Sequence, residues 1–382
     1  MDEAFRARIE HALGKRKLQG NYRSLQLSTE LVDFFSNDYL GLARSQELQE
    51  AIHTCTKFIE PGFLNGSGGS RLLAGNHPGV LELEHFLAAF YQAPASLLFN
   101  SGYDANLAFF SAVPQRGDTV LYDELIHASV IDGARLGFAR RVSFKHNDTR
   151  DLVAVLKQAT GCVFVAVEAL YSMTGDLAPL EALVMLSQEH HFTLIVDEAH
   201  STGVFGQGGR GCFDALFSGD APATDIVRLH TFGKAAGTHG AAFVLQPWLK
   251  EFIVNYARPF IYSTALPAHS LAAIHESHLF MEKAGEDRKR LKKNLLCFLS
   301  NLPPKFRSVS SANSAGAPIR TIPVPGNFKC LEAASKLAAA GFNVRPIRSP
   351  TVPEGHEQLR ICLHSFNSQQ EILGLTQVLS DL

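Results

Sequence analysis

Residues 226–243 read IVRLHTFGKAAGTHGAAF, a short apolar run that ends in a lysine among small residues. The β-branched and apolar residues at its start predict a buried strand, and a second apolar run follows. Gly233, Ala235 and Ala236 flank Lys234, so a ligand could come close to the backbone here. The pattern fits a lysine that carries an aldehyde cofactor as a Schiff base, and it also fits a solvated loop lysine. The rest of the chain has to decide between these two interpretations.

Six further apolar runs of this kind occur between residues 95 and 245, separated by helical stretches. They are nearly continuous in Val, Leu, Ile and Phe, which is typical of strands covered on both faces. Seven such strands joined mainly by helices predict a large α/β domain with a mostly parallel sheet. Ligands bind beyond the carboxyl ends of the strands in such sheets, so the residues directly after each run are candidates. The expected strands are 96–99, 119–122, 142–144, 163–167, 194–196, 226–229 and 241–245.

The remaining chain predicts a smaller α+β domain. Residues 2–20 have the pattern of a charged amphipathic helix, and one long helix is expected to run from about residue 262 to 302. The predicted parts are 1–45, an N-terminal helix and strand that pack with the small domain, 46–270, the large ligand-binding domain, and 271–382, the C-terminal domain. The C-terminal domain is expected to contain strands at 319–324, 343–347 and 359–363 and helices at 328–341 and 367–381.

The composition is that of an ordinary globular protein, with 46% hydrophobic and 19% charged residues. The formal net charge of −2 argues against nucleic acid as a partner. The N-terminus is too charged for a secretory signal and no apolar run could span a bilayer, so we expect a cytoplasmic protein with no membrane partner. The six cysteines are scattered without a CxxC pair, which indicates neither a disulfide framework nor a zinc site.

Asp197 directly follows one of the predicted buried strands, in the sequence Asp-Glu-Ala-His. A buried acid is costly unless it meets a cation, and a protonated pyridine nitrogen would be such a cation. His200 could then reach a hydroxyl of the same ring. A helicase would need an upstream GxxxxGK[ST] loop and a basic chain, and the sequence has neither. A divalent metal held by Asp197, Glu198 and His200 is the alternative, but no further ligand cluster accompanies it.

Polar residues also follow three of the other runs. Ser101-Gly102 opens a predicted helix, where free N–H groups and the helix dipole could bind a phosphate or where Ser101 could simply cap the helix. His127 could stack on an aromatic cofactor or be an ordinary half-buried histidine. The turn that contains Ser172 offers hydrogen bonds to a ligand. With Lys234 and Asp197, these residues fit a site for pyridoxal phosphate (PLP).

Motifs along nearly the whole chain resemble those of the α-oxoamine synthases, which join an amino acid to an acyl-CoA and release carbon dioxide. The resemblance implies a fold-type I, aspartate aminotransferase-like fold, PLP as the cofactor, and a homodimer whose active sites lie between the subunits. The matching motifs are 35–42, 66–70, 101–106, 127–129, 171–176, 197–200, 231–234 and 262–264.

The resemblance also implies a role for each matching residue. Lys234 would hold the internal aldimine and move the α-proton, Asp197 would pair with the pyridine nitrogen, and His127 would stack on the ring. Asn37 and Arg360 would bind the carboxylate of the amino acid or product, a role that suits an arginine fork. The remaining cofactor contacts would come from His200 and Ser172 at the ring oxygen, from Gly102, Tyr103 and Thr231 at the phosphate, and from Ser263 and Thr264 of a second subunit.

Within the family, Asn37-Asp38 and the segment 347–360 favour L-alanine as the amino acid and a pimeloyl thioester, carried by CoA or a carrier protein, as the acyl donor. The alternatives are glycine C-acetyltransferase, serine palmitoyltransferase, and a regulatory protein that binds the cofactor without turnover. The sequence departs from the family pattern at Arg71, Tyr171 and Ala235-Ala236. These departures leave the expected reaction type intact and the acyl-chain preference open.

Overall fold

The computed structural model describes residues 2–25, 30–58, 64–217, 226–309 and 316–382. The chain divides into two compact units, a larger one of residues 37–172 and 176–288 and a smaller one of residues 1–36, 173–175 and 289–382. Sequence analysis placed the boundaries at 45/46 and 270/271, whereas the units divide the chain at 36/37 and 288/289. The later boundary arises because helix α11 (Ala268–Lys283) packs against helices α2 and α3 of the larger unit.

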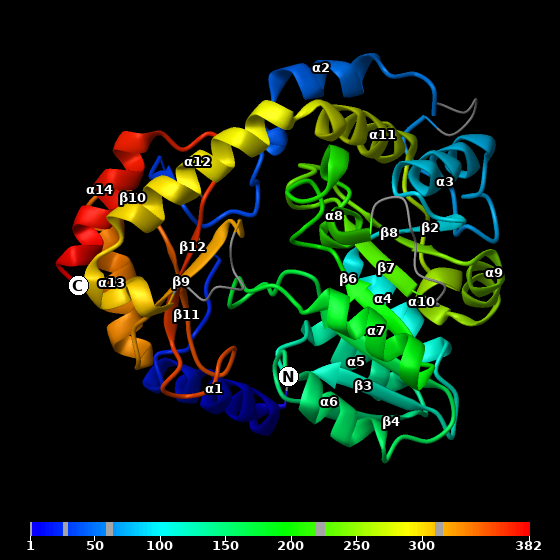
Figure 1. The fold of residues 1–382 in the computed structure, drawn as a ribbon, viewed down its shortest axis with the longest axis horizontal. Helices are drawn as coiled ribbons and strands as arrows, with labels where there is room; N and C mark the ends of the chain where they lie inside the picture. The colour runs from blue at the N-terminus through cyan, green and yellow to red at the C-terminus, as the bar shows by residue number, and fades with distance from the viewer. Residues whose placement is uncertain (1, 26–29, 59–63, 218–225, 310–315) are drawn as a thin grey trace. The chain divides into compact units, whose positions relative to one another are not determined.

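A seven-stranded sheet forms the centre of the larger unit (Figure 1). Its strand order is β2-β8-β7-β6-β5-β3-β4, and β8 is antiparallel to both of its neighbours while all other neighbouring pairs are parallel. The structure therefore confirms the predicted fold class and all seven predicted strands. The strands are β2 (Ala95–Phe99), β3 (Thr119–Asp123), β4 (Arg140–Phe144), β5 (Val163–Glu168), β6 (Thr193–Asp197), β7 (Ile226–Thr231) and β8 (Ala241–Leu245).

Helices cover both faces of this sheet, which explains why the strand sequences are continuously apolar. Successive side chains of a strand point to opposite faces. Phe164 and Ala166 therefore pack with α4, α5, α9 and α10, whereas Val165 and Val167 pack with α6, α7 and α8. The helices of the larger unit are α2 (Gln46–Thr54), α3 (Pro78–Phe90), α4 (Gly102–Ala112), α5 (Ala128–Leu136), α6 (Thr149–Leu156), α7 (Leu180–His190), α8 (Cys212–Phe217), α9 (Pro247–Tyr256), α10 (Arg258–Ile261) and α11, with 3-10 turns at Leu42–Arg44 and Gln207–Gly209.

The same alternation fixes the direction of the last residue in three neighbouring strands. Glu168, Asp197 and Thr231 end β5, β6 and β7. Each lies an even number of positions after a residue that packs against α4 and α5, such as Ala166 or Ile195. All three side chains therefore belong to the α4/α5 face, at the carboxyl edge of the sheet.

The smaller unit is built on an antiparallel sheet of order β11-β12-β9, with a separate parallel pair of β1 and β10. This mixed arrangement is the predicted α+β part of the fold. Its elements are α1 (Glu3–Leu18), β1 (Val32–Asp33), α12 (Gly285–Asn301, whose first residues belong to the larger unit), the 3-10 turn Pro304–Val309, β9 (Ile319–Pro323), α13 (Asn327–Ala339), β10 (Phe342–Asn343), β11 (Arg345–Ile347), β12 (Gln358–Cys362) and α14 (Gln369–Ser380).

The prediction of one continuous helix from about residue 262 to 302 is wrong. Helix α11 ends at Lys283 and α12 begins at Gly285. Between them Ala284 leaves the helical region with ψ of 35°, and its N–H turns back to the Met281 carbonyl at 3.2 Å. Arg288 also donates to that carbonyl at 2.8 Å. Glycine weakens a helix locally, but a break of one residue hardly disturbs the apolar periodicity on which the prediction rested.

Helix α1 confirms the predicted N-terminal helix, although none of its residues is buried. Its apolar stripe of Phe5, Ile9 and Leu13 is 45%, 43% and 43% exposed. Neither α1 nor any other helix in the described part of the chain is both long and apolar enough to cross a membrane.

Candidate functional site

Lys234 lies in the tight turn that joins β7 to β8. The turn is closed by a hydrogen bond of 2.8 Å from the Gly237 N–H to the Lys234 carbonyl. A Cβ on Gly237 would come within 2.4 Å of the Ala43 backbone nitrogen, and φ there is +69°. Only glycine fits this position without strain. The side chain of Lys234 is half-buried, and its Nζ donates to Thr231 Oγ1 at 3.2 Å.

Asp197 ends the neighbouring strand and is buried. Its Oδ2 accepts a hydrogen bond of 3.1 Å from Asn106 Nδ2, and its Oδ1 accepts one of 3.0 Å from the Ala199 N–H. Among the described residues, no cation forms an ion pair with this carboxylate. A buried carboxylate held by neutral donors alone is suited to a cationic group that is brought in by a ligand.

A chain of hydrogen bonds links Asp197 to the predicted stacking histidine. Asn106 Nδ2 also lies 2.9 Å from Ser129 Oγ, which in turn lies 2.8 Å from His127 Nδ1. Sequence analysis quoted Asn106 in a motif without giving it a role. Its signal was a polar residue one turn after Gly102, among residues that are otherwise small or apolar on the buried face of the helix. Asn106 Oδ1 is buried and has no partner among the described residues, so the network has an unused acceptor.

His127 caps helix α5, and its Nδ1 accepts from the Ser129 N–H at 3.3 Å. Part of the ring is exposed. Desolvation of the rest lowers the pKa of His127, Lys234 acts in the same direction, and Asp197 opposes the shift. The ring is therefore biased towards its neutral form, which suits a flat surface for stacking rather than a second cation.

Helix α4 begins at Gly102 and presents its N-terminus beside β7. Ser101 caps the helix by accepting from the Asp104 N–H at 3.1 Å. The N–H groups of Gly102 and Tyr103 belong to the first turn, which has no intrahelical acceptors. A Cβ at Gly102 would lie only 2.5 Å from Thr231 Cγ2. Glycine thus allows the helix end to approach the strand end that carries Thr231, which leaves a cradle of backbone donors for an anion.

Glu168 is a buried acid to which sequence analysis assigned no individual role. It pairs in register with Asp197 on the adjacent strand. Its Oε2 accepts from the Ser172 N–H at 2.9 Å, and its Oε1 is buried with no partner among the described residues. Burial raises the pKa of Glu168 to about 8, with Asp197 acting in the same direction and Lys234 against it. Glu168 is therefore mainly a neutral acid at pH 7, and Asp197 lies beside an uncharged neighbour.

His200 and Asn37 are joined through a residue without a predicted role, the fully buried Tyr39. His200 Nδ1 lies 2.8 Å from Tyr39 Oη, which donates to Asn37 Oδ1 at 3.1 Å. The Tyr39 hydroxyl thus joins His200 and Asn37 in one hydrogen-bonded group. Its signal in the sequence was a tyrosine two residues after Asn37, inside the motif at 35–42.

The alternative metal site at Asp197, Glu198 and His200 does not fit the geometry. The Glu198 carboxylate accepts from the Cys212 and Phe213 N–H groups at 2.8 and 2.7 Å. It therefore anchors the start of α8 and is not directed to the same point as Asp197. The two carboxylates and the imidazole serve three separate networks.

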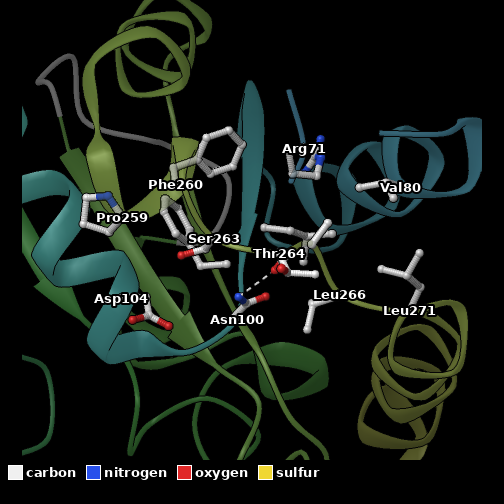
Figure 2. Close-up of a pocket in the computed structure, with 13 residues that line it drawn as sticks. Arg71, Val80, Asn100, Asp104, Pro259, Phe260, Ser263, Thr264, Leu266 and Leu271 are labelled. Atoms are coloured by element: carbon white, nitrogen blue, oxygen red, sulfur yellow. Dashed lines mark hydrogen bonds between the residues drawn. The ribbon is translucent and has the colours of Figure 1, made fainter. Parts of the chain in front are cut away.

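The predicted phosphate residues Ser263 and Thr264 line a small cavity together with Arg71, Asn100 and Asp104 (Figure 2). Asn100 Nδ2 donates to the Thr264 carbonyl at 2.9 Å, across the middle of the view. The Arg71 guanidinium donates to the buried Glu84 carboxylate at 2.7 Å. Arg71, one of the departures from the family pattern, is thus held in a partly buried ion pair. The role of Ser263 and Thr264 in a second subunit stays a prediction.

Arg360 lies on β12 in the smaller unit and is buried. Its Nη1 lies 3.0 Å from the Sγ of Cys362. Strand pairing places it opposite Thr321 and Arg345. The assignment of a substrate carboxylate to this guanidinium stays a prediction.

A second polar cluster lies on the other face of the sheet. His146 Nδ1 lies 2.9 Å from Asp123 Oδ1, and its Nε2 lies 2.6 Å from Asp176 Oδ2. Burial disfavours the charged ring, but the two carboxylates outweigh it and raise the pKa of His146 to about 9. The rings of His146 and Tyr171 are perpendicular, with a centroid distance of 4.5 Å. Tyr171 and Asp176 are the two ends of the turn that contains Ser172, and Asp123 ends β3. The charged imidazole of His146, just after β4, contacts all three and holds them together, and we call this arrangement the His146 clamp.

Comparison with known proteins identifies the family of this chain. The family model described as aminotransferase class I and II matches residues 29–375. The chain belongs to this family. It is similar to the 8-amino-7-oxononanoate synthase of Emericella nidulans, with 39% identity over 99% of this chain and 94% of that protein.

Solved structures give the same result. The 8-amino-7-oxononanoate synthase of Francisella tularensis is 29% identical, with a TM-score of 0.77 over 92% of this chain and 97% of that one. A serine palmitoyltransferase structure with the PLP internal aldimine is 25% identical, with a TM-score of 0.87 over 100% of this chain and 99% of that one. These relatives confirm the resemblance drawn from the sequence motifs.

Proposed function

We propose that this chain is a PLP-dependent acyltransferase that condenses L-alanine with a pimeloyl thioester. The products are 8-amino-7-oxononanoate, carbon dioxide and the free thiol of CoA or of a carrier protein. The observation that carries this proposal is the convergence of Lys234, Asp197 and the first turn of α4 at neighbouring strand ends. The full-length relative at 39% identity supports the choice of reaction.

The residues present fit PLP at three points. Asp197 is a buried anion with no cationic partner in the described chain, as a protonated pyridine nitrogen requires. The free N–H groups of Gly102 and Tyr103 suit a phosphate. Lys234 supplies the amine that would hold the cofactor covalently. When bound there, PLP supplies a sink for the electrons released at the α-carbon of the amino acid.

The protein groups around this position control charge and protons. Lys234 would remove and return the α-proton, and Thr231 Oγ1 accepts from its Nζ and so orients it. Asn106 fixes the carboxylate of Asp197, which would keep the ring nitrogen protonated. Glu168, biased towards its neutral form, leaves Asp197 as the local negative charge. His127 offers an uncharged ring for stacking.

The remaining contacts are proposed from the family resemblance. The amino acid or product carboxylate would be bound by Asn37 and Arg360. A homodimer would complete each site, so the purified protein would sediment with twice the 41.7 kDa mass of one chain. The other assigned positions are His200 and Ser172 at the ring oxygen, Thr231 at the phosphate, and Ser263 and Thr264 donated to the partner's site.

A serine palmitoyltransferase activity is the second candidate, because a structure of that enzyme shares the whole fold. A substrate panel separates the two activities. Purified protein is mixed with L-alanine, glycine or L-serine and with pimeloyl-, acetyl- or palmitoyl-CoA, and CoA release and product mass are followed. We expect L-alanine with pimeloyl-CoA to react fastest. The Lys234→Ala protein should release CoA only at the background rate. A clear preference for L-serine with palmitoyl-CoA would replace the first proposal by the second.

A further inference from the structure

Three potential metal ligands meet where helix α2 ends beside helix α11. Cys55 caps the C-terminus of α2, and its N–H is bonded to the Ala51 carbonyl at 3.0 Å. His275 and Glu276 are on α11, which packs against α2. One ligand atom from each of the three side chains lies within 4.8 Å of the other two. The His275 Nδ1 and Glu276 Oε1 atoms are already 2.9 Å apart.

The surroundings hold these groups in place. The side chains of His275 and Glu276 are only 12% and 17% exposed. The imidazole packs against the rings of Phe86 and Phe58, at centroid distances of 4.6 and 5.4 Å. A ring wedged between two aromatic side chains loses little further entropy when it binds a ligand.

The electrostatic balance favours a dication. A thiolate, a carboxylate and a neutral imidazole carry a total charge of about −2, which one divalent ion would neutralise. The nearby Lys57 directs its ammonium to Glu82, at 2.8 Å. Burial raises the pKa of Cys55, and the Lys57 charge opposes this shift and so favours the thiolate. Cys55 also lines an open cavity of about 750 Å³, which gives this ligand access to solvent.

We propose that Cys55, His275 and Glu276 form a zinc site that ties α2 to α11. Sulfur, nitrogen and oxygen ligands together suit Zn²⁺, whereas Mg²⁺ and Ca²⁺ prefer oxygen alone. Tetrahedral zinc holds such ligand atoms about 3.3–3.7 Å apart, so small side-chain rotations from the observed positions suffice. The Cys55 thiol releases its proton to solvent when the metal binds, whereas the neutral imidazole of His275 coordinates through a nitrogen lone pair and keeps its charge. Sequence analysis expected no zinc site because the cysteines form no CxxC pair, and Cys55 lies far from the other two ligands along the chain.

The test measures zinc affinity rather than enzyme activity. Metal-free protein that retains its PLP is titrated with Zn²⁺ against a chromophoric chelator, and thermal unfolding is followed in parallel. We expect one equivalent to bind with a Kd of about 1 μM or lower. Zinc at a large excess over that Kd should raise the unfolding temperature, since it binds only the folded state.

The variants make the test specific. Cys55→Ser and His275→Ala should each weaken zinc binding by about 100-fold or more, and Glu276→Gln by about 10-fold. The matched controls are Cys162→Ser, another cysteine, and His269→Ala, which lines the same cavity. Both controls should bind zinc like the natural protein. Circular dichroism checks that each variant is folded. No stoichiometric binding to the natural protein, or equal affinity in Cys55→Ser and His275→Ala, would overturn the proposal.

Discussion

Asn106 on α4 donates a hydrogen bond of 3.1 Å to Asp197 at the end of β6. The same amide nitrogen lies 2.9 Å from Ser129 Oγ, which continues to His127. One amide therefore sets the positions of the groups proposed for the nitrogen and the face of the cofactor ring. Because both acceptors are buried or partly buried, removal of the amide leaves them short of a donor.

Replacement of Asn106 should weaken cofactor binding. Asn106→Leu keeps the size of the side chain and removes both hydrogen bonds. A hydrogen bond to a charged group contributes about 1.5–3 kcal/mol, so PLP should bind about 10- to 150-fold more weakly. Equilibrium dialysis against free PLP measures the change. Asn255→Leu, on the exposed part of α9, is the control. Equal PLP affinity in both variants would show that the amide does not support the site.

The close approach of Gly102 to Thr231 predicts that a substitution at position 231 offsets the destabilisation caused by a substitution at position 102. Gly102→Ala places a Cβ about 2.5 Å from Thr231 Cγ2, so α4 must shift away from β7. Overpacking of this kind costs about 1–3 kcal/mol. Thr231→Ser removes Cγ2 and keeps the hydroxyl that accepts from Lys234. Urea unfolding of the two single variants and the double variant should show that alanine at 102 is better tolerated with serine at 231. Additive effects would contradict the predicted clash.

Glu168 predicts a pH dependence of stability. Its pKa is about 8 in the folded protein and 4.5 as the reference for the unfolded chain. Between these values the folded state holds a proton that the unfolded state has lost, so this group makes the protein less stable as the pH rises from 4.5 to 8. Glu168→Gln mimics the neutral acid and removes the effect. The free energy of unfolding of the natural protein, relative to Glu168→Gln, should therefore fall over this range.

The same variant also tests what Glu168 does in the site. Because glutamine is neutral, Glu168→Gln should keep its PLP, whereas Glu168→Leu should bind PLP more weakly. Loss of PLP from Glu168→Gln would mean that the site needs the ionised carboxylate of Glu168. The same conclusion would follow if the difference in unfolding free energy between the natural protein and Glu168→Gln did not change with pH.

His146 predicts a second dependence at higher pH. Its pKa is raised from 6.5 to about 9 by two carboxylates. The clamp is therefore fully stabilising below pH 6.5 and is lost as the pH rises through 9. The free energy of unfolding of the natural protein minus that of His146→Gln, measured from pH 6 to 10, should show this loss. A direct NMR titration that finds His146 half-protonated near pH 6.5 would contradict the clamp.

The strand ends were predictable because each chemical group directly follows an apolar run. Asp197 and Lys234 were found in this way, and the parallel sheet brings them to one edge. Asn106 and Glu168 could not be assigned roles in advance. Their partners come from other elements, and a pKa raised by burial depends on neighbours that a single sequence does not place. The break at Ala284 was missed for a different reason, since one non-helical residue leaves the apolar pattern almost unchanged.

The central claim is that Lys234 holds the cofactor beside Asp197. The most direct measurement is reduction of the PLP-loaded protein with borohydride, which fixes the pyridoxyl group to its lysine, followed by proteolysis and mass spectrometry. The account predicts one labelled peptide, modified at Lys234, and no label at that position in Lys234→Ala. A label on a different lysine, or a PLP-treated natural protein that takes up no label, would contradict it.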